Sequence, residues 1–296
     1  FVTTAASVPD GGGSDDNGTY DVFYRDLDSG VTTRITDGDG RSDEVAISQD
    51  GRFVAFTSRS SNLVADDTNG HGDVFLWDRD SSTTTLVSKG LAWGSGEALS
   101  MSGDGRFVGY NGPLGSWHGA YLWDRTTGAT VLSAGTPGHS GGAWDVSRTG
   151  QAIVYSDARG TDDGWIQQAY VWDRATGERV GIDQSVNGAW FRASDDGQVV
   201  VFQKGTVYRW DRASGVSTPF GSESGQSMLP MISSDGTLVA FISFQSDLTG
   251  APMPASPGLA LYDARPGSTS WIAPSGPAYP SMTPDGSRIL TANLSN

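Results

Sequence analysis

Apolar residues along this chain fall into short stretches that are bounded by polar turns and mostly end in an aromatic residue followed by aspartate. A clear example is DVFLWD at residues 73–78, which precedes a turn of small and polar residues. Six such stretches end at Asp26, Asp78, Asp124, Asp173, Asp211 and Asp263. Short runs of β-branched and aromatic residues between turns predict β-strands. The chain is therefore expected to be a series of similar strand units.

A turn dipeptide that ends in glycine recurs before other apolar stretches. Its six copies are Asp50-Gly51, Asp104-Gly105, Thr149-Gly150, Asp196-Gly197, Asp235-Gly236 and Asp285-Gly286. An Asp-Gly turn between two apolar stretches indicates a β-hairpin. The second repeat then has four predicted strands, at residues 45–48, 53–57, 73–78 and 83–88. Four antiparallel strands in a meander are typical of one propeller blade.

The repeats follow one another at intervals of 38 to 54 residues, which is typical of a propeller or another repeat array. The first unit lacks an Asp-Gly hairpin before Asp26, and the last hairpin, at Asp285, has no aspartate-ending strand after it. The two incomplete units complement each other. We therefore expect an all-β, six-bladed β-propeller over residues 1–296, closed by pairing of the N- and C-terminal strands. Residues 1–5 and 288–292 both look like a second strand, so seven blades are the alternative.

The repeats resemble the TolB-like, WD-type β-propeller repeat of bacterial proteins, which has a serine-x-aspartate-glycine hairpin and an apolar-Trp-Asp strand. Residues 58–88, SRSSNLVADDTNGHGDVFLWDRDSSTTTLVS, are especially similar to that pattern. The resemblance covers almost the whole chain and implies the fold. It implies little about function, because such propellers serve as enzymes, binding modules and scaffolds.

Composition narrows the partners. The 296 residues carry a net charge of −15 and only two lysines, which argues against nucleic acid and anionic membranes as partners. There is no cysteine, and no apolar run approaches the length of about 18 residues that spans a bilayer. The chain begins at Phe1, so a removed secretion signal is plausible. We expect a secreted or periplasmic monomer.

Four of the ten tryptophans recur at one place in the repeat, which predicts packing positions. They are Trp77, Trp123, Trp172 and Trp210. The aspartate after each of them is expected to accept backbone N–H bonds from the following turn.

Aromatic residues outside that position suggest a binding surface. Most are placed by the meander in second-to-third-strand loops or in connections between blades, which emerge on one face. They are Trp93, Trp117, Trp144, Trp165, Trp190, Phe191 and Tyr279. Aromatic side chains on loops favour sugar rings or apolar groups, with ordinary packing between blades as the alternative. The leading hypothesis is a module that binds a carbohydrate, a peptide or another small extracellular ligand.

An enzyme is the main alternative. His118 and His139 are predicted on the same face, and Asp145 and Arg192 stand at the same offset in adjacent repeats. These four residues could serve a lyase or hydrolase at the channel mouth, although Asp145 and Arg192 could also form a plain salt bridge. The sequence contains no G-x-S-x-G, H-E-x-x-H or phosphate-binding loop. A protein-interaction scaffold is a third possibility.

Two loops share the pattern D-x-N-G-x-x-D, at residues 15–21 and 67–73. Carboxylate and amide oxygens at alternate positions around a glycine can converge on Ca²⁺. The candidate ligands are Asp15, Asn17, Asp21, Asp67, Asn69 and Asp73. The pattern lacks the bidentate glutamate of an EF-hand loop, and a turn that bonds its own backbone is the alternative. A structural Ca²⁺ is the expected cofactor.

Overall fold

The computed structural model consists of β-strands and turns. It describes residues 2–3, 18–89, 91, 95–114, 117–134, 139–161, 164–184, 190–223, 225–246, 248–249, 257–273 and 281–290. The chain divides into two compact units, Phe1–Ala143 and Trp144–Asn296. Within the described ranges there is no helix at all, and hence none that could cross a membrane.

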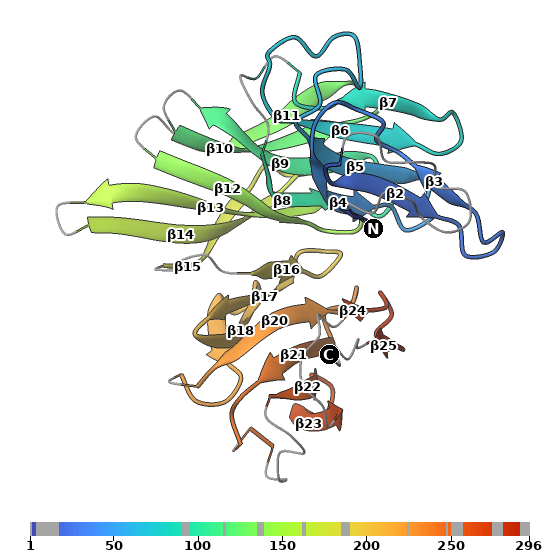
Figure 1. Ribbon diagram of the computed structural model, residues 1–296. Coiled ribbons are helices and arrows are strands. Elements are labelled where there is room, and N and C mark those ends of the chain that lie inside the picture. Colours follow the sequence, from blue (N-terminus) through green and yellow to red (C-terminus); the bar gives the residue numbers. More distant parts are fainter. Residues whose placement is uncertain are drawn as a thin grey trace. The chain divides into compact units, whose positions relative to one another are not determined.

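The first unit holds three antiparallel sheets (Figure 1). A three-stranded sheet contains β1 (Val2–Thr3), β2 (Asp21–Arg25) and β3 (Thr32–Arg34). The next contains β4 (Ser42–Ile47), β5 (Phe53–Ser58), β6 (Asp73–Asp78) and β7 (Thr83–Leu86). The third contains β8 (Ser95–Met101), β9 (Phe107–Leu114), β10 (Trp117–Asp124) and β11 (Ala129–Ala134).

The second unit continues the pattern with three four-stranded sheets and a hairpin. The first sheet is β12 (His139–Val146), which begins before the unit boundary, β13 (Ala152–Thr161), β14 (Gly164–Asp173) and β15 (Arg179–Gln184). The second is β16 (Phe191–Ala193), β17 (Val199–Lys204), β18 (Thr206–Asp211) and β19 (Val216–Pro219). The third is β20 (Ser227–Ile232), β21 (Leu238–Ser243), β22 (Gly258–Asp263) and β23 (Ser268–Ala273). The hairpin is β24 (Ser281–Met282) and β25 (Ile289–Leu290).

The predicted four-stranded meander is thus confirmed in five sheets. The three-stranded sheet β1–β3 and the hairpin β24–β25 correspond to the two incomplete repeats. Their joining into one blade, the count of six blades and the single closed domain stay predictions.

The hairpin between the first two strands of each repeat is fixed by local hydrogen bonds. In the second repeat, the Ser48 hydroxyl donates to Asp50 at 2.6 Å and accepts the N–H of Phe53 at 2.9 Å. Gly51 follows with a φ of 68°, a backbone conformation that glycine adopts without steric cost. The same pair of hydroxyl hydrogen bonds recurs at Ser102, Ser194, Ser233 and Thr283.

The prediction for the strand-ending aspartates is confirmed. Asp124 accepts the backbone N–H of Thr126 at 2.9 Å, and Arg106 pairs with its carboxylate at 2.8 Å. These hydrogen bonds lower the pKa of Asp124 to about 2, with that from Arg106 the strongest cause. Backbone N–H groups of the adjoining turn also reach Asp26, Asp78, Asp173, Asp211 and Asp263.

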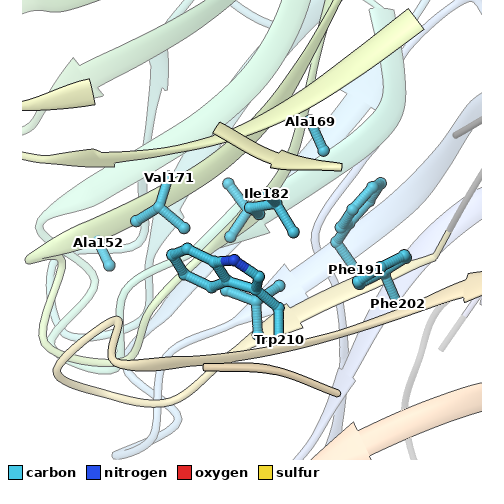
Figure 2. Close-up of a cluster of buried hydrophobic side chains, with 9 residues drawn as sticks. Ala152, Ala169, Val171, Ile182, Phe191, Phe202 and Trp210 are labelled. Atoms are coloured by element: carbon cyan, nitrogen blue, oxygen red, sulfur yellow. The ribbon is translucent and has the colours of Figure 1, made fainter. Parts of the chain in front are cut away.

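Apolar side chains are buried where neighbouring sheets pack. Figure 2 shows one such cluster in the second unit, where Trp210 lies near Val171 and Ile182 and the rings of Phe191 and Phe202 lie side by side. The repeated tryptophan position is a packing position, as predicted. Trp77, Trp123 and Trp210 are buried, and Trp172 is partly buried.

Candidate functional site

The predicted aromatic surface is only partly described. Trp93 and Tyr279 lie outside the described residues. Three more tryptophans of this set lie in strands, since Trp117 begins β10, Trp144 lies in β12 and Trp165 lies in β14. The expected placement of Trp117 and Trp165 in loops was wrong, since the hairpins β9–β10 and β13–β14 stay paired to the last residues before the turn. Trp144 was expected in the connection between blades, but β12 already begins at His139. Their side chains are outside the description, so their role as ligand contacts stays a prediction.

Trp190 and Phe191 have opposite environments. The Trp190 side chain is 51% exposed, whereas Phe191 is only 1% exposed and stacks on Phe202 with the ring centroids 5.7 Å apart. Successive residues of an extended chain point to opposite faces. Phe191 is therefore a packing residue, which corrects its assignment to the ligand surface, and Trp190 keeps its exposed indole.

Asp145 and Arg192 lie together, as their equal offsets in adjacent repeats suggested. Arg192 Nη1 lies 4.0 Å from Asp145 Oδ1 and donates to the carbonyl of Phe191 at 2.7 Å. The other Asp145 oxygen accepts the backbone N–H of Ala193 at 2.9 Å. The carboxylate of β12 is thus tied to β16 by one backbone hydrogen bond and one ion pair.

The electrostatics of this pair differ from those of a plain surface salt bridge. Burial raises the pKa of Asp145 to about 6, although Arg192 and the Ala193 N–H favour the charged form and Asp195 opposes it. The Asp145 side chain is 14% exposed, while that of Arg192 is 42% exposed. A carboxyl group that titrates near neutral pH beside an accessible guanidinium can bind or exchange protons with a polar ligand.

Phe244 is an exposed aromatic residue that sequence reasoning missed. Its side chain is 40% exposed, and its N–H donates to the carbonyl of Gln226, the residue before β20. The same hydrogen bond in the neighbouring sheet joins the N–H of Gln203 to the carbonyl of Trp190, the residue before β16. Trp190 therefore corresponds to Gln226, and Phe244 corresponds to Gln203. Because β20 packs against β16 and β17, the two exposed rings lie at corresponding ends of neighbouring sheets. In the sequence, Phe244 directly follows the apolar stretch LVAFIS at residues 238–243, and no motif distinguishes it from that stretch.

The strand β20 carries backbone strain close to this end. Leu229 has a φ of 55°, and the pairing of β20 with β21 shifts between Met228 and Met231. A left-handed conformation at a non-glycine residue costs on the order of 1 kcal/mol and often occurs at binding sites. The bulge alters the direction of the residues that follow Gln226.

Among the described side chains, no histidine contact with Asp145 or Arg192 is observed. His118 lies on β10 of the first unit and is exposed, and His139 is the first residue of β12, with its side chain outside the description. A catalytic grouping of these histidines with Asp145 and Arg192 stays a prediction.

The first acidic loop is described only at its end, because Asp15 and Asn17 lie outside the described residues. Asp21 is fully buried, with one carboxylate oxygen accepting from Thr36 at 2.9 Å and the other from Arg34 at 2.6 Å. Its charge is balanced by Arg34. The assignment of Asp21 as a calcium ligand is therefore corrected to a buried ion pair.

The second acidic loop is described in full. Asn69 donates to Asp73 at 2.7 Å and accepts the N–H of His71 at 2.7 Å, so the predicted Asn-Gly turn is present. Asp73 is fully buried and also accepts from the Ser88 hydroxyl. Burial raises the pKa of Asp73, and the nearby charge of Asp67 adds to this effect. In the described part of the chain, no three His, Cys, Asp or Glu side chains gather as a metal site.

Comparison with known proteins bears on the fold. No family model matches the chain. An uncharacterized protein of Agrobacterium fabrum, Atu1656, is 49% identical over 39 residues, which is 13% of this chain and 13% of that relative.

Solved structures cover far more of the chain. The β-propeller domain of the Trilobed protease from Pyrococcus furiosus matches with a TM-score of 0.60 and 15% identity, covering 88% of this chain and 79% of that one. An oligogalacturonate lyase in complex with manganese matches with a TM-score of 0.53 and 14% identity over 92% of both chains. A provisionally named TolB from Agrobacterium tumefaciens matches with a TM-score of 0.53 and 14% identity, over 85% and 87%. Such identities establish the fold alone, and the chain has the all-β fold of a TolB-like β-propeller.

Proposed function

We propose that this protein is an extracellular or periplasmic binding module that holds a carbohydrate at Trp190, Phe244 and the Asp145–Arg192 pair. The observation that carries the proposal is the exposed indole of Trp190, two residues before an exposed guanidinium that is paired with a partly buried carboxylate. Aromatic rings stack on the apolar face of a sugar, while paired charged groups bind its hydroxyls. The net charge of −15 agrees with an uncharged ligand better than with a polyanion.

The test is a glycan array, followed by calorimetry with the sugars that bind. We expect Trp190→Ala to weaken binding at least tenfold and Trp190→Phe to retain part of the affinity, because a smaller ring can still stack. Val216→Ala is the control, since Val216 is 55% exposed on β19 in the same unit. Equal affinity of Trp190→Ala and the wild type would reject the proposal. Binding of peptides but no sugars would replace the ligand class.

A lyase or hydrolase is the second candidate, and the pKa of Asp145 near 6 is the observation that favours it. A carboxyl group with such a pKa can donate and accept protons near neutral pH. Under this hypothesis the bound glycan is cleaved, and the pH–rate profile shows an apparent pKa close to 6 that Asp145→Asn removes. Saturable binding without product would leave the binding module as the function.

A further inference from the structure

Asp21 begins β2 in the first repeat and Asp73 begins β6 in the second, and the two aspartates are anchored in the same way. In the first repeat, the Thr36 hydroxyl accepts the N–H of Val22 at 3.0 Å and donates to Asp21. In the second, the Ser88 hydroxyl accepts the N–H of Val74 at 3.0 Å and donates to Asp73. Asp21 and Asp73 are therefore equivalent positions, and both are completely buried.

The two repeats differ at one position of the strand that follows the aspartate, which is β3 in the first repeat and β7 in the second. Arg34 pairs with Phe23 in the register of β2 and β3, and Leu86 pairs with Phe75 in the register of β6 and β7. Arg34 reaches the second carboxylate oxygen of Asp21. Leu86 is uncharged, and among the described side chains the corresponding oxygen of Asp73 accepts a hydrogen bond from the neutral amide of Asn69.

The second repeat also buries another carboxylate. Asp67 is 8% exposed, and neither of its carboxylate oxygens has a hydrogen-bond partner within the described ranges. The neighbouring Lys89 pairs with Asp66 at 2.9 Å, where both side chains are more than half exposed. Buried carboxylates are normally paired with a cation or bound to a metal. This loop therefore buries two aspartates, and the described side chains give Asp67 no partner.

We propose that Asp67 and Asp73 bind a Ca²⁺ ion, which takes the place that Arg34 has in the first repeat. The Asn69 amide, which presents its Nδ2 to Asp73 and its oxygen to the His71 N–H, turns away from that carboxylate when the ion binds. Ca²⁺ accepts carboxylate and amide oxygens with flexible geometry, whereas Mg²⁺ requires a near-ideal octahedron. Two carboxylates balance its charge. Backbone oxygens and water complete the coordination, as expected for a loop without a bidentate glutamate. We expect a dissociation constant on the order of 10⁻⁴ M, typical of extracellular modules.

The direct test is thermal unfolding and calorimetry of the full chain after treatment with EDTA, with Ca²⁺ or Mg²⁺ added back. Ca²⁺ is expected to raise the Tm of the wild type. Asp67→Asn should weaken Ca²⁺ binding at least tenfold and remove the shift, while its metal-free form stays folded because a buried charge has been removed. Asp66→Asn is the matched control and should respond like the wild type.

A second measurement needs only the wild type. Tb³⁺ should bind with luminescence excited through nearby aromatic residues, and Ca²⁺ should displace it. The proposal is overturned if Ca²⁺ up to about 10 mM neither binds nor shifts the Tm, or if Asp67→Asn responds as the wild type does. A Tm that depends on pH but not on Ca²⁺ would also overturn it. The site lies in the first unit, so either result leaves the test at Trp190 unaffected.

Discussion

The loops before β2 and β6 have the same D-x-N-G-x-x-D pattern, but the negative charges of their last aspartates, Asp21 and Asp73, are balanced differently. Asp21 has a hydroxyl and a guanidinium, whereas Asp73 has a hydroxyl and a neutral amide. The hydroxyl anchor belongs to the repeat because it also satisfies a strand N–H. The positive charge that balances the aspartate is not repeated, since it comes from Arg34 on β3, whose equivalent on β7 is Leu86.

The comparison teaches that a repeated motif can have one role in the backbone and another in charge balance. A buried ion pair inside the protein needs no ligand. A repeat that loses the arginine but keeps the aspartates must obtain a cation from solvent, bind a proton or accept a less stable fold. The following predictions test what the two repeats share and where their charge balance differs.

The largest effect is expected from Arg34→Met, which leaves the carboxylate of Asp21 buried without its charge partner. Removing one partner of a buried pair typically costs about 3–5 kcal/mol. The Arg34 and Asp21 side chains are only 10% and 0% exposed, so solvent cannot replace the lost charge. Urea denaturation and hydrogen exchange of the Val22 amide measure the loss.

Two further variants control that experiment. Adding Asp21→Asn to Arg34→Met should restore much of the stability, because no unpaired charge is then buried. Arg41→Met removes an ion pair whose side chains are 54% and 37% exposed, and should cost no more than about 1 kcal/mol. A cost below that value for Arg34→Met would show that Asp21 does not need its cation.

The second prediction tests the shared part of the two loops. Thr36→Val and Ser88→Ala each remove a hydroxyl that joins a strand N–H to a buried carboxylate. Leaving such groups unsatisfied costs about 2 kcal/mol. We expect similar losses in both repeats, measured by urea denaturation and by faster exchange of the Val22 and Val74 amides. A loss in only one repeat would contradict the equivalence of the anchors.

The third prediction uses the opposite end of β6, where Asp78 has the arginine that Asp73 lacks. The Arg52 hydrogen bond lowers the pKa of Asp78 from 3.8 to about 2. A lowered folded-state pKa stabilises the protein above the unfolded pKa, and this stability is lost as the pH falls toward 2. The shift corresponds to roughly 2 kcal/mol, and solvent screening reduces the expected effect to about 1 kcal/mol.

Asp78→Asn tests this in urea titrations at neutral and acidic pH. It should lower stability by that amount at neutral pH and have a much smaller effect near pH 2, because about half of the wild-type carboxyl groups are then protonated. Asp28→Asn, at an exposed turn position, is the control and should be silent at both pH values. An equal cost of Asp78→Asn at both pH values would mean that shape, and not charge, makes Asp78 important.

The parts of the fold that local hydrogen bonds determine could be predicted from the sequence. Ser48 and Asp50 are two residues apart, and their hydrogen bond and the left-handed Gly51 form one short turn. How far the two strands of each hairpin stay paired could not be predicted. Residues 157–161 and 164–168 look like parts of a loop, yet they continue the β13–β14 ladder.

The buried ion pair of the first repeat and the candidate site were less predictable, because both depend on the strand register between residues that are distant in the sequence. Arg34 and Asp21 are thirteen positions apart, and only the pairing of β2 with β3 brings them together. Likewise, strand alternation predicts that only one of Trp190 and Phe191 faces the core, but the pairing of Phe191 with Phe202 decides which. The pairing of Asp145 with Arg192 was predictable, since both residues have the same offset in adjacent repeats.

The smallest effect is expected at the exposed pair beside the second loop. Lys89 and Asp66 lie 2.9 Å apart with side chains 69% and 51% exposed. Water and salt screen such pairs, so Lys89→Met should change the free energy of unfolding by less than about 0.5 kcal/mol. The buried pair of the first repeat has a similar distance of 2.6 Å, so the contrast with Arg34→Met measures mainly the effect of burial. A large loss in Lys89→Met at low salt would mean that Lys89 compensates the loop carboxylates, and would remove the need for a cation at Asp67.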